Sequence, residues 1–458
     1  MANPKIPAGS VSVPSSSALR LYLPETRGNS FSLDGFPSLE GGTDWLKRLT
    51  EIINTLGAVG MTTNQTLFRQ LLETGSLDNR LRSLKAQGTS AAEIYRLLYN
   101  EEALRAAGAF RQIHARWPWD GRVSQEASAL LTETEPLVRE VRRIADCMKE
   151  VGSFTKIPNL PVGPEVTEKV LASGGLIHPN ITLVFSDSHY LRTVEGYLKG
   201  LQARAREIDK IHSVNSLFVS RVDRVTDPMI DEAAQKTTDE KVLNRLRLIK
   251  GKTGVSQAKV IYRMFEAIFL GVPFQDPEKL YPDASAKIKD LRARFVELQG
   301  LGAHPQRLLI ASTGVKSDQP YSPLLYVLPF LGPWTANTMP ESTLEALSRS
   351  VAGWSDHFVE GILKRHIMRE PLPAIPTDSK PSAFWDDAVL MSRQERREKE
   401  IGEITPDEVL RDLKKLVLEP KKTTLQAICD TLRDKGAASF MADEQATLQK
   451  IQEKLQQL

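Results

Sequence analysis

The feature that most constrains the fold of this chain is a regular alternation of short apolar stretches with helical patterns. Runs rich in β-branched and other apolar residues recur along the sequence, and most are followed by a segment with helical periodicity. We expect eight strands, centred near residues 33, 60, 123, 156, 183, 218, 310 and 337. Such alternation is typical of a parallel sheet in an α/β protein. Eight units over roughly 300 residues favour a closed (β/α)8 barrel of the TIM type.

The ends of the 458-residue chain differ from this central pattern. Residues 1–17 are rich in Pro and Ser and lack the apolar centre of a secretory signal, so we expect a disordered arm. The barrel should occupy residues 18–350. Residues 351–458 should form a helical extension packed on or next to the barrel.

Within this extension the sequence predicts five segments. They are a proline-rich loop over residues 369–385, a solvated helix face over 392–403, amphipathic helices over 406–418 and 424–434, and a terminal helix over 446–458.

Composition excludes several classes of protein. The net charge of +3 is too small to indicate nucleic acid as a partner, and no apolar run approaches the roughly 20 residues of a membrane span. Only Cys147 and Cys429 are present, which favours a reducing compartment, and we expect the cytoplasm. The seven histidines show no ligand spacing, so we expect no metal site.

A lysine in the middle of an apolar strand is the first chemical candidate. In the strand over residues 153–158, Phe154 and Lys156 point to the same face, and Pro158 ends the run. A lysine on an inward face is costly unless it is paired or its pKa falls, and a lysine with a lowered pKa forms Schiff bases. The alternative is a side chain that extends to water.

The barrel hypothesis favours the functional reading. In such barrels the chemistry lies at the carboxyl ends of the strands. This rule gathers one group of polar residues around a single mouth: Asp34, Asn64, Glu126, Lys156, Thr182, Ser216 and Ser312.

Seven motifs, in order, resemble the successive strand motifs of transaldolases, most closely those of the longer bacterial-type branch. The resemblance spans about residues 30–347. The motifs are Gly57-Ala-Val-Gly-Met-Thr-Thr-Asn64, Gly121-Arg-Val-Ser-Gln-Glu126, Phe154-Thr-Lys156-Ile-Pro158, Asn180-Ile-Thr182-Leu-Val-Phe-Ser186, Ser216-Leu-Phe-Val-Ser-Arg221-Val-Asp223, Ala311-Ser-Thr-Gly-Val-Lys316 and Asn337-Thr-Met-Pro340.

The resemblance implies an enzyme without a cofactor that moves a dihydroxyacetone unit from a ketose phosphate to an aldose phosphate through a lysine Schiff base. Lys156 would be the nucleophile, with Glu126 and Thr182 positioning a water that shuttles protons. The expected partners are sugar phosphates, with no nucleic acid and no membrane. The sequence does not fix the oligomeric state, and a homodimer is compatible with it.

The resemblance also assigns substrate contacts. Asn64 and Asn180 would hold substrate hydroxyls. The barrel rule, rather than the resemblance, adds Ser312 as a substrate contact at the mouth. Ser216, Arg221 and Lys316 would bind the phosphate, and Arg221 suits this because its guanidinium binds phosphate bidentately. The residue-level alternative for Arg221 is a surface ion pair with Asp223.

The acid/base residue of the family's first strand allows two alignments. In one, residues 21–24 form that strand and the family's aspartate has become Pro24. In the other, residues 31–34 form it and Asp34 is the acid/base. Asp34 lies 30 residues before Asn64, which is closer to the family's spacing than the 40 residues that separate Pro24 from Asn64.

Other departures leave a second function open. Asn159-Leu160 stands where the family usually has Ala-Thr, and Asn64 is followed by Gln65 rather than proline. A Schiff-base enzyme redirected to another carbonyl substrate is therefore the alternative. A barrel that serves only as a scaffold is a third hypothesis, and the retained Lys156, Glu126 and Thr182 argue against it.

Overall fold

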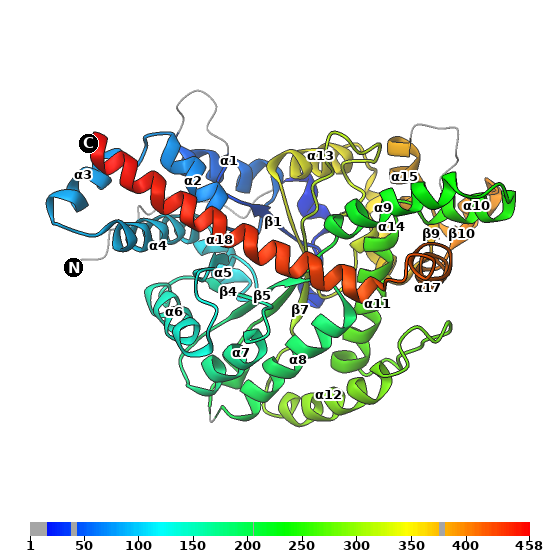
Figure 1. Ribbon diagram of the computed structural model, residues 1–458, viewed down its shortest axis with the longest axis horizontal. Coiled ribbons are helices and arrows are strands. Elements are labelled where there is room, and N and C mark those ends of the chain that lie inside the picture. The colour runs from blue at the N-terminus through cyan, green and yellow to red at the C-terminus, as the bar shows by residue number, and fades with distance from the viewer. Residues whose placement is uncertain (1–15, 38–43, 205, 375–380) are drawn as a thin grey trace.

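The computed structural model describes residues 16–37, 44–204, 206–374 and 381–458 (Figure 1). The expected disordered arm lies outside the described residues except for Ser16 and Ser17. Ser16 is buried, and Ser17 begins the short 3-10 helix η1 (Ser17–Leu21).

Eight parallel strands close into a barrel in sequence order, as the alternation predicts. The ring is completed by pairing of the first strand with the last, Ser30 opposite Ala336. The strands are β1 (Ser30–Asp34), β2 (Gly60–Thr62), β3 (Val123–Glu126), β4 (Ser153–Pro158), β5 (Pro179–Val184), β6 (Val214–Phe218), β7 (Arg307–Ala311) and β8 (Thr335–Met339).

Helices cover the outside of this barrel. Most of them pack their apolar faces on the barrel, the two helices Asp78–Ala86 and Glu240–Ile249 pack on other helices instead, and the polar mouth is left at the carboxyl ends. They are α1 (Trp45–Leu56), α2 (Gln65–Glu73), α3 (Asp78–Ala86), α4 (Ala91–Ala109), α5 (Arg111–Arg116), α6 (Thr134–Cys147), α7 (Gly163–Ala172), α8 (Asp187–Gln202), α9 (Ser220–Gln235), α10 (Glu240–Ile249), α11 (Thr253–Phe265), α12 (Ala284–Gln299) and α13 (Glu341–Ala352).

Two strand predictions need correction. Residues 21–24, one of the two candidates for the family's first strand, form no strand: Leu21 ends η1, and Pro24 begins a second 3-10 helix, η2 (Pro24–Thr26). The run after Val214 is a strand only as far as Phe218, and α9 begins at Ser220. Val219 and Val222 are buried, but not as strand residues. They lie just before and within the first turn of α9 and face the core from there.

The inside of the barrel is a packed core of its own. Aromatic and aliphatic side chains from β4, β5, β6 and β7 fill it, including Phe154, Phe185 and Leu309. Cys429 joins this cluster from the C-terminal part of the chain. Because the interior is filled, room for a ligand remains only at the two ends of the barrel.

The C-terminal extension is more structured than the sequence suggests. It contains α14 (Asp356–Lys364), η7 (Ile367–Arg369), β9 (Leu372–Pro373), α15 (Pro381–Leu390), α16 (Arg393–Glu398), β10 (Glu403–Ile404), α17 (Pro406–Asp412), η8 (Leu413–Leu418) and α18 (Leu425–Gln457). Two expectations were wrong. The expected loop over 369–385 contains β9 and the start of α15, and the expected solvated face of α16 contains the buried Arg396, which pairs with Glu403 at 2.9 Å.

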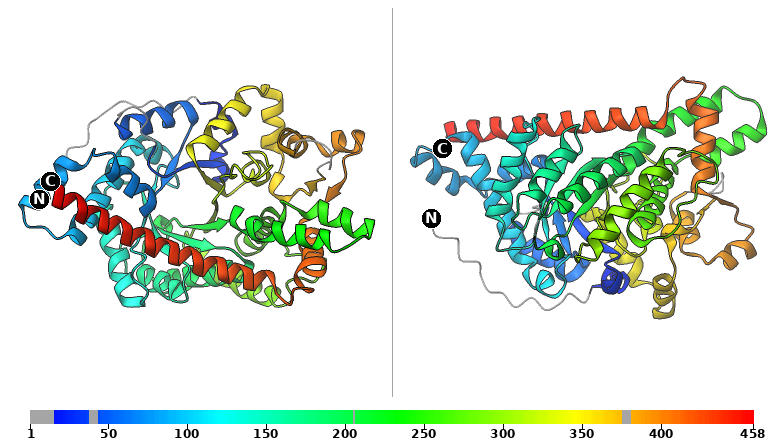
Figure 2. Two further views of the ribbon diagram at one scale, coloured as in Figure 1. Left: turned by 45° about the horizontal axis from the view of Figure 1, so that its top comes forward. Right: turned by 90° about the horizontal axis from the view of Figure 1, so that it is seen from below.

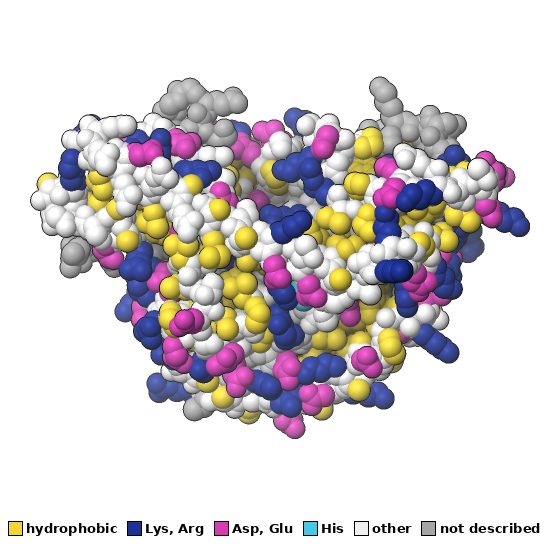
Figure 3. All heavy atoms as spheres, viewed as in Figure 1, with side chains coloured by type: hydrophobic (Ala, Val, Ile, Leu, Met, Phe, Trp, Pro, Cys, Tyr) yellow, Lys and Arg dark blue, Asp and Glu magenta, His cyan; other side chains and the backbone are white. Residues whose placement is uncertain are grey.

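The last helix, α18, is 33 residues long and crosses the carboxyl end of the barrel as one element (Figure 1, Figure 2). The sequence predicts two helices here, and this prediction was wrong. Polar contacts hold α18 along its length: His189 contacts Asp430 at 2.8 Å near the start, Thr66 donates to Asp443 at 2.7 Å in the middle, and Lys454 donates to Asp78 at 2.6 Å near the end. On the face that α18 crosses, basic and acidic side chains are interspersed (Figure 3). Within the described ranges no helix combines the length and apolarity needed to cross a membrane.

Candidate active site

Lys156 lies in the mouth of the barrel, buried and paired. The strand register places it beside Glu126 of β3 and Asn180 of β5. Its Nζ donates to the Thr63 carbonyl at 3.0 Å and lies 3.4 Å from Glu126 Oε1. The residue is 6% exposed, so the side chain does not extend to bulk water. A buried lysine amine with a carboxylate beside it has the arrangement that Schiff-base formation requires, a nucleophile with a proton-transfer group within reach.

Glu126 is the buried carboxylate of this pair. Neither of its oxygens has a hydrogen-bond partner within the described part of the chain. Burial raises the pKa of Glu126, the charge on Lys156 opposes that rise, and Glu444 and Asp34 add to it. A carboxyl group with a raised pKa is suited to take up and return protons.

A cavity of about 90 Å³ lies above Lys156. It is lined by Asp34, Thr62, Asn64, Lys156, Thr182, Ser216, Phe218, Arg221, Ala311, Ser312, Thr338 and Phe440. These side chains come from seven of the eight strands or the residues that follow them, from α9 and from α18. Phe440 of α18 closes the cavity, with its ring centre 5.8 Å from Lys156 Nζ.

Asp34 and Pro24 occupy different places in the structure. Asp34 is the last residue of β1, lines the cavity and accepts a hydrogen bond from the Thr62 hydroxyl at 2.8 Å. Pro24 lies in η2, before the barrel begins, and does not line the cavity. The alignment that uses Asp34 therefore agrees with the strand order.

Several polar residues hold one another beneath the cavity. Asn180 accepts from the Ser216 hydroxyl at 2.6 Å and donates to the Ser124 hydroxyl at 3.1 Å. Asn180 is fully buried and does not line the cavity, so its contact with a substrate would pass through Ser216. By contrast, the Thr182 hydroxyl lines the cavity and has no partner among the described residues. Asn64 lines the cavity while its side chain also caps α2, accepting from the Leu67 N–H.

Arg221 reaches the cavity from the first turn of α9 rather than from a strand end. Its guanidinium stacks 5.1 Å from the Phe218 ring centre and makes no ion pair within the described ranges. Burial lowers the pKa of Arg221, and Asp34 and Glu126 oppose that change. The surface ion pair with Asp223 does not form: Asp223 is buried and accepts from the Gly254 N–H and the Tyr326 hydroxyl.

Of two further residues expected to contact the substrate, Ser312 lines the cavity and Lys316 does not. Ser312 lines the cavity with a left-handed backbone (φ 57°), and its hydroxyl lies 3.0 Å from that of Ser220. Lys316 is exposed in the loop after β7 and does not line the cavity. A phosphate beside Arg221 would therefore meet hydroxyl groups rather than Lys316.

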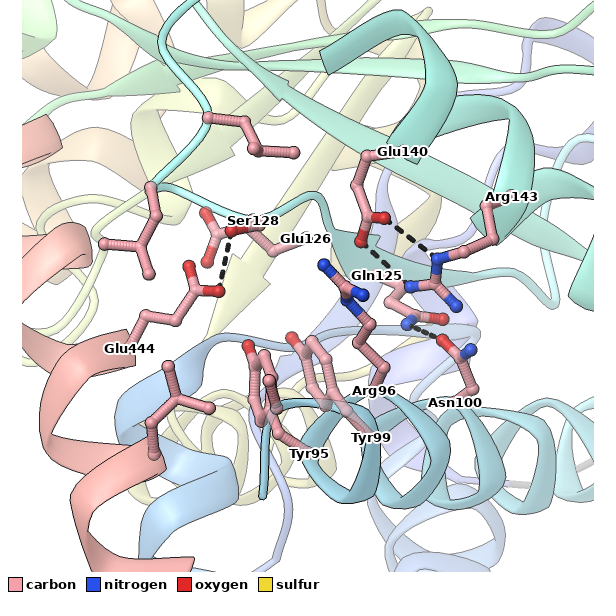
Figure 4. Close-up of a pocket in the computed structure, with 14 residues that line it drawn as sticks. Tyr95, Arg96, Tyr99, Asn100, Gln125, Glu126, Ser128, Glu140, Arg143 and Glu444 are labelled. Atoms are coloured by element: carbon pink, nitrogen blue, oxygen red, sulfur yellow. Dashed lines mark hydrogen bonds and ion pairs between the residues drawn. The ribbon is translucent and has the colours of Figure 1, made fainter. Parts of the chain in front are cut away.

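A second cavity, of about 190 Å³, lies behind Glu126 (Figure 4). Tyr95, Tyr99, Asn100 and other residues of α4 form one wall, and Glu444 of α18 enters from the other side. Glu444 accepts from the Ser128 hydroxyl and from the Ala129 N–H, both at 2.7 Å. These two hydrogen bonds connect α18 to the segment that follows Glu126.

Sequence reasoning missed Phe440 and Glu444 because no motif marks α18. Thr62 and Thr338 lie inside quoted motifs but were not singled out, and their hydroxyls are 2.7 Å apart. Both belong to the strand ends that the barrel rule identifies. That rule could have found the two threonines, whereas nothing local marks the residues of α18.

Comparison with known proteins agrees with this geometry. Residues 43–368 match the family model described as Transaldolase/Fructose-6-phosphate aldolase, and α18 lies outside the match. A transaldolase of Thermobifida fusca is 35% identical over 306 residues, covering 66% of this chain and 74% of that protein. Transaldolase 1 of Streptomyces avermitilis is also 35% identical, over 324 residues (67% and 77%). A transaldolase of Trichodesmium erythraeum is 32% identical over 304 residues (65% and 74%). The chain therefore belongs to the transaldolase/fructose-6-phosphate aldolase family.

Proposed function

We propose that this protein is a transaldolase that transfers a dihydroxyacetone unit from a ketose phosphate, fructose 6-phosphate or sedoheptulose 7-phosphate, to an aldose phosphate. The observation that carries the proposal is the buried pair of Lys156 and Glu126, with Nζ and Oε1 3.4 Å apart at the mouth of the barrel. The two free cysteines agree with a cytoplasmic enzyme.

The first half of the reaction forms the Schiff base. The neutral Lys156 amine attacks the ketone carbon, and the carbonyl oxygen becomes a hydroxyl. Glu126, carrying the proton that the neutral lysine lacks, would give it to the carbonyl oxygen, take one from the nitrogen, and give that one to the hydroxyl as it leaves as water. The unpartnered Thr182 hydroxyl can hold that water.

The second half breaks and remakes a carbon–carbon bond. The cationic imine withdraws electrons from the neighbouring carbon. Asp34 takes the proton of the hydroxyl next to the breaking bond, the aldehyde product leaves, and an enamine remains on Lys156. The acceptor aldehyde is then attacked by the enamine, and hydrolysis frees the lysine. Arg221 would hold the phosphate of the donor, which departs with the aldehyde product, and then the phosphate of the acceptor.

A coupled assay with fructose 6-phosphate and erythrose 4-phosphate tests the proposal. The wild-type protein should turn over, while Lys156→Ala and Asp34→Ala should lose at least about a thousandfold in kcat, because nucleophile and acid/base each act only in the chemical steps. Lys47→Ala, which removes an exposed lysine of α1, is the matched control and should keep full activity. An active Lys156→Ala variant would reject the proposal.

One observation favours a second candidate, a Schiff-base enzyme for another carbonyl substrate. Phe440 comes from outside the matched part of the chain and closes the cavity to about 90 Å³. A pocket closed in this way would select a smaller substrate if α18 stays in place. A wild-type protein that fails in the coupled assay but is trapped by a small ketone at Lys156 would support this candidate.

A further inference from the structure

A row of histidines lies at the amino end of the barrel, opposite the site around Lys156. Four of the seven histidines, His114, His178, His212 and His304, line one cavity of about 430 Å³. Three of them stand just before successive strands: His178 before β5, His212 before β6 and His304 before β7. The chain thus places an imidazole at the entry of three neighbouring strands.

These imidazoles stack instead of converging on a point. The rings of His212 and His304 are 4.6 Å apart and nearly parallel, at 3°, and His178 lies 6.0 Å from His212. His178 Nδ1 accepts from the His212 backbone N–H, and the ring nitrogens of His212 have no partner among the described residues. No cluster of three or more metal-ligating side chains is present in the described ranges. The row therefore presents nitrogen donors to a ligand, not a metal centre.

Cations surround the same cavity. Arg27 lies between two indole rings, 4.7 Å from Trp119 and 5.3 Å from Trp334, and none of its guanidinium N–H groups has an acceptor within the described part of the chain. Arg122 lies at the inner wall, where it is buried and donates to the carbonyls of Pro118 and Ser153.

Few negative charges balance these groups. Lys149 and Lys210 also line the cavity, although Lys210 is paired with Glu207 at 2.9 Å, and the carboxylate among the lining residues is Asp209. The nearby carboxylate of Asp120 is already engaged, because Arg307 pairs with it at 3.1 Å and the hydroxyls of Tyr22 and Ser30 donate to it. The cavity is therefore left with a positive potential.

The pKa values of the histidines are lowered in this cavity, partly by the neighbouring arginines. Burial lowers the pKa of His178 well below its ordinary value, and the charge on Arg122 lowers it further. The pKa of His304 is lowered by burial and then by Arg27. An anion in the cavity would relieve this repulsion between like charges.

We propose that this cavity binds a phosphate-bearing small molecule. Arg27 offers unused N–H groups to the phosphate oxygens, and the imidazoles offer further nitrogen donors. The indole of Trp119, which lines the cavity, can pack against the organic part of such a ligand. The site is separate from the one around Lys156, since it lies at the other end of a filled barrel, and it does not depend on the reaction proposed above.

Nuclear magnetic resonance of the full chain, labelled with ¹³C in its histidines, can test the site with inorganic phosphate and ribose 5-phosphate as probes. An Arg221→Ala background limits phosphate binding at the carboxyl end. We expect saturable shifts of the His178, His212 and His304 signals and no shift of the exposed His357 signal. Arg27→Gln should weaken this binding about tenfold or more, because it removes a charge-assisted contact.

Two controls separate a site from general screening. Sodium chloride at matched ionic strength should not reproduce the shifts, and Arg82→Gln, which removes an exposed arginine of α3, should leave the affinity unchanged. Lys149→Glu is a second variant, for the case in which Arg27→Gln fails to fold, and it should also weaken binding. Shifts that do not saturate, that appear equally with chloride, or that survive both cavity variants would overturn the proposal.

Discussion

Single residues decide how protons reach the reacting atoms, and the acidity of the buried Glu126 depends on the charges of its neighbours. Lys156 stabilises its ionised form, while Asp34 and Glu444 oppose ionisation. Glu444 belongs to α18, outside the part of the chain that matches the family. The acidity of Glu126 in this protein therefore depends partly on an element that the family match does not include.

Replacing Glu444 with glutamine tests this dependence. Glutamine can still accept from the Ala129 N–H, but the negative charge near Glu126 is gone. The ionised form of Glu126 then costs less, so its pKa falls, and the acidic limb of kcat/KM should move to lower pH by about half a unit. Glu453→Gln, at an exposed position of the same helix, is the control. An unmoved limb in Glu444→Gln would assign the residue a purely structural role.

At this scale the sequence was informative where residues lie at strand ends. Asp34, Glu126 and Lys156 lie where their motifs and the barrel rule predict. The sequence pattern predicts Arg221 at the end of a strand, because Val219 and Val222 extend the apolar run of β6, whereas the residue lies in α9. The same spacing of three also fits one face of a helix.

Among the elements, α18 is the one whose position matters most for the site. Gly436 allows it to pass close to the barrel: a Cβ at this position would lie 2.8 Å from Leu183 Cδ2 and 3.3 Å from Arg221 Nη1. Leu183 itself has a left-handed backbone (φ 62°) at an irregularity of β5. The closure of the cavity thus rests on a close contact between a glycine and a bulged strand.

Gly436→Leu should push α18 away from the barrel. We expect a loss of about 1–3 kcal/mol in the free energy of unfolding from overpacking. We also expect a higher KM or an altered substrate preference, since Phe440 lies one turn further along the helix. Ala438→Leu places the same side chain at an exposed position of α18 and should change neither quantity. Equal behaviour of the two variants would contradict a close contact at Gly436.

The sequence predicts eight strands in the correct order, but it predicts two separate helices where the structure has the single helix α18. The helix packs on several different elements along its length, including α2, α4 and α9. Its buried side therefore changes along the chain, and no single apolar stripe marks it as one helix. Its course over the barrel depends on contacts between residues hundreds of positions apart, such as Thr66 with Asp443.

For the whole molecule, the buried histidines make stability depend on pH. The folded-state pKa of His178 lies well below its ordinary value of 6.5. The unfolded chain therefore binds more protons below pH 6.5, and this residue's contribution to stability is lost as pH falls. The loss is at most about 1.4 kcal/mol for each pH unit below 6.5.

Urea unfolding in phosphate-free buffer at pH 7 and pH 5 measures this effect. Wild type should lose more free energy of unfolding between the two pH values than His178→Gln does, because glutamine cannot titrate. His357→Gln, at an exposed position, should behave like wild type. The comparison cancels the titration of buried acids such as Asp223, whose pKa burial raises to about 8. An equal pH dependence in all three proteins would contradict the account.

The most direct test of the central claim is to reduce the protein with borohydride in the presence of fructose 6-phosphate and to locate the adduct by mass spectrometry. We predict that a three-carbon dihydroxyacetone adduct forms on Lys156, because cleavage leaves that unit on the lysine, and that Asp34→Ala retains the uncleaved six-carbon adduct instead. An adduct on another lysine, or none with any carbonyl substrate, would contradict the assignment of Lys156 as the nucleophile.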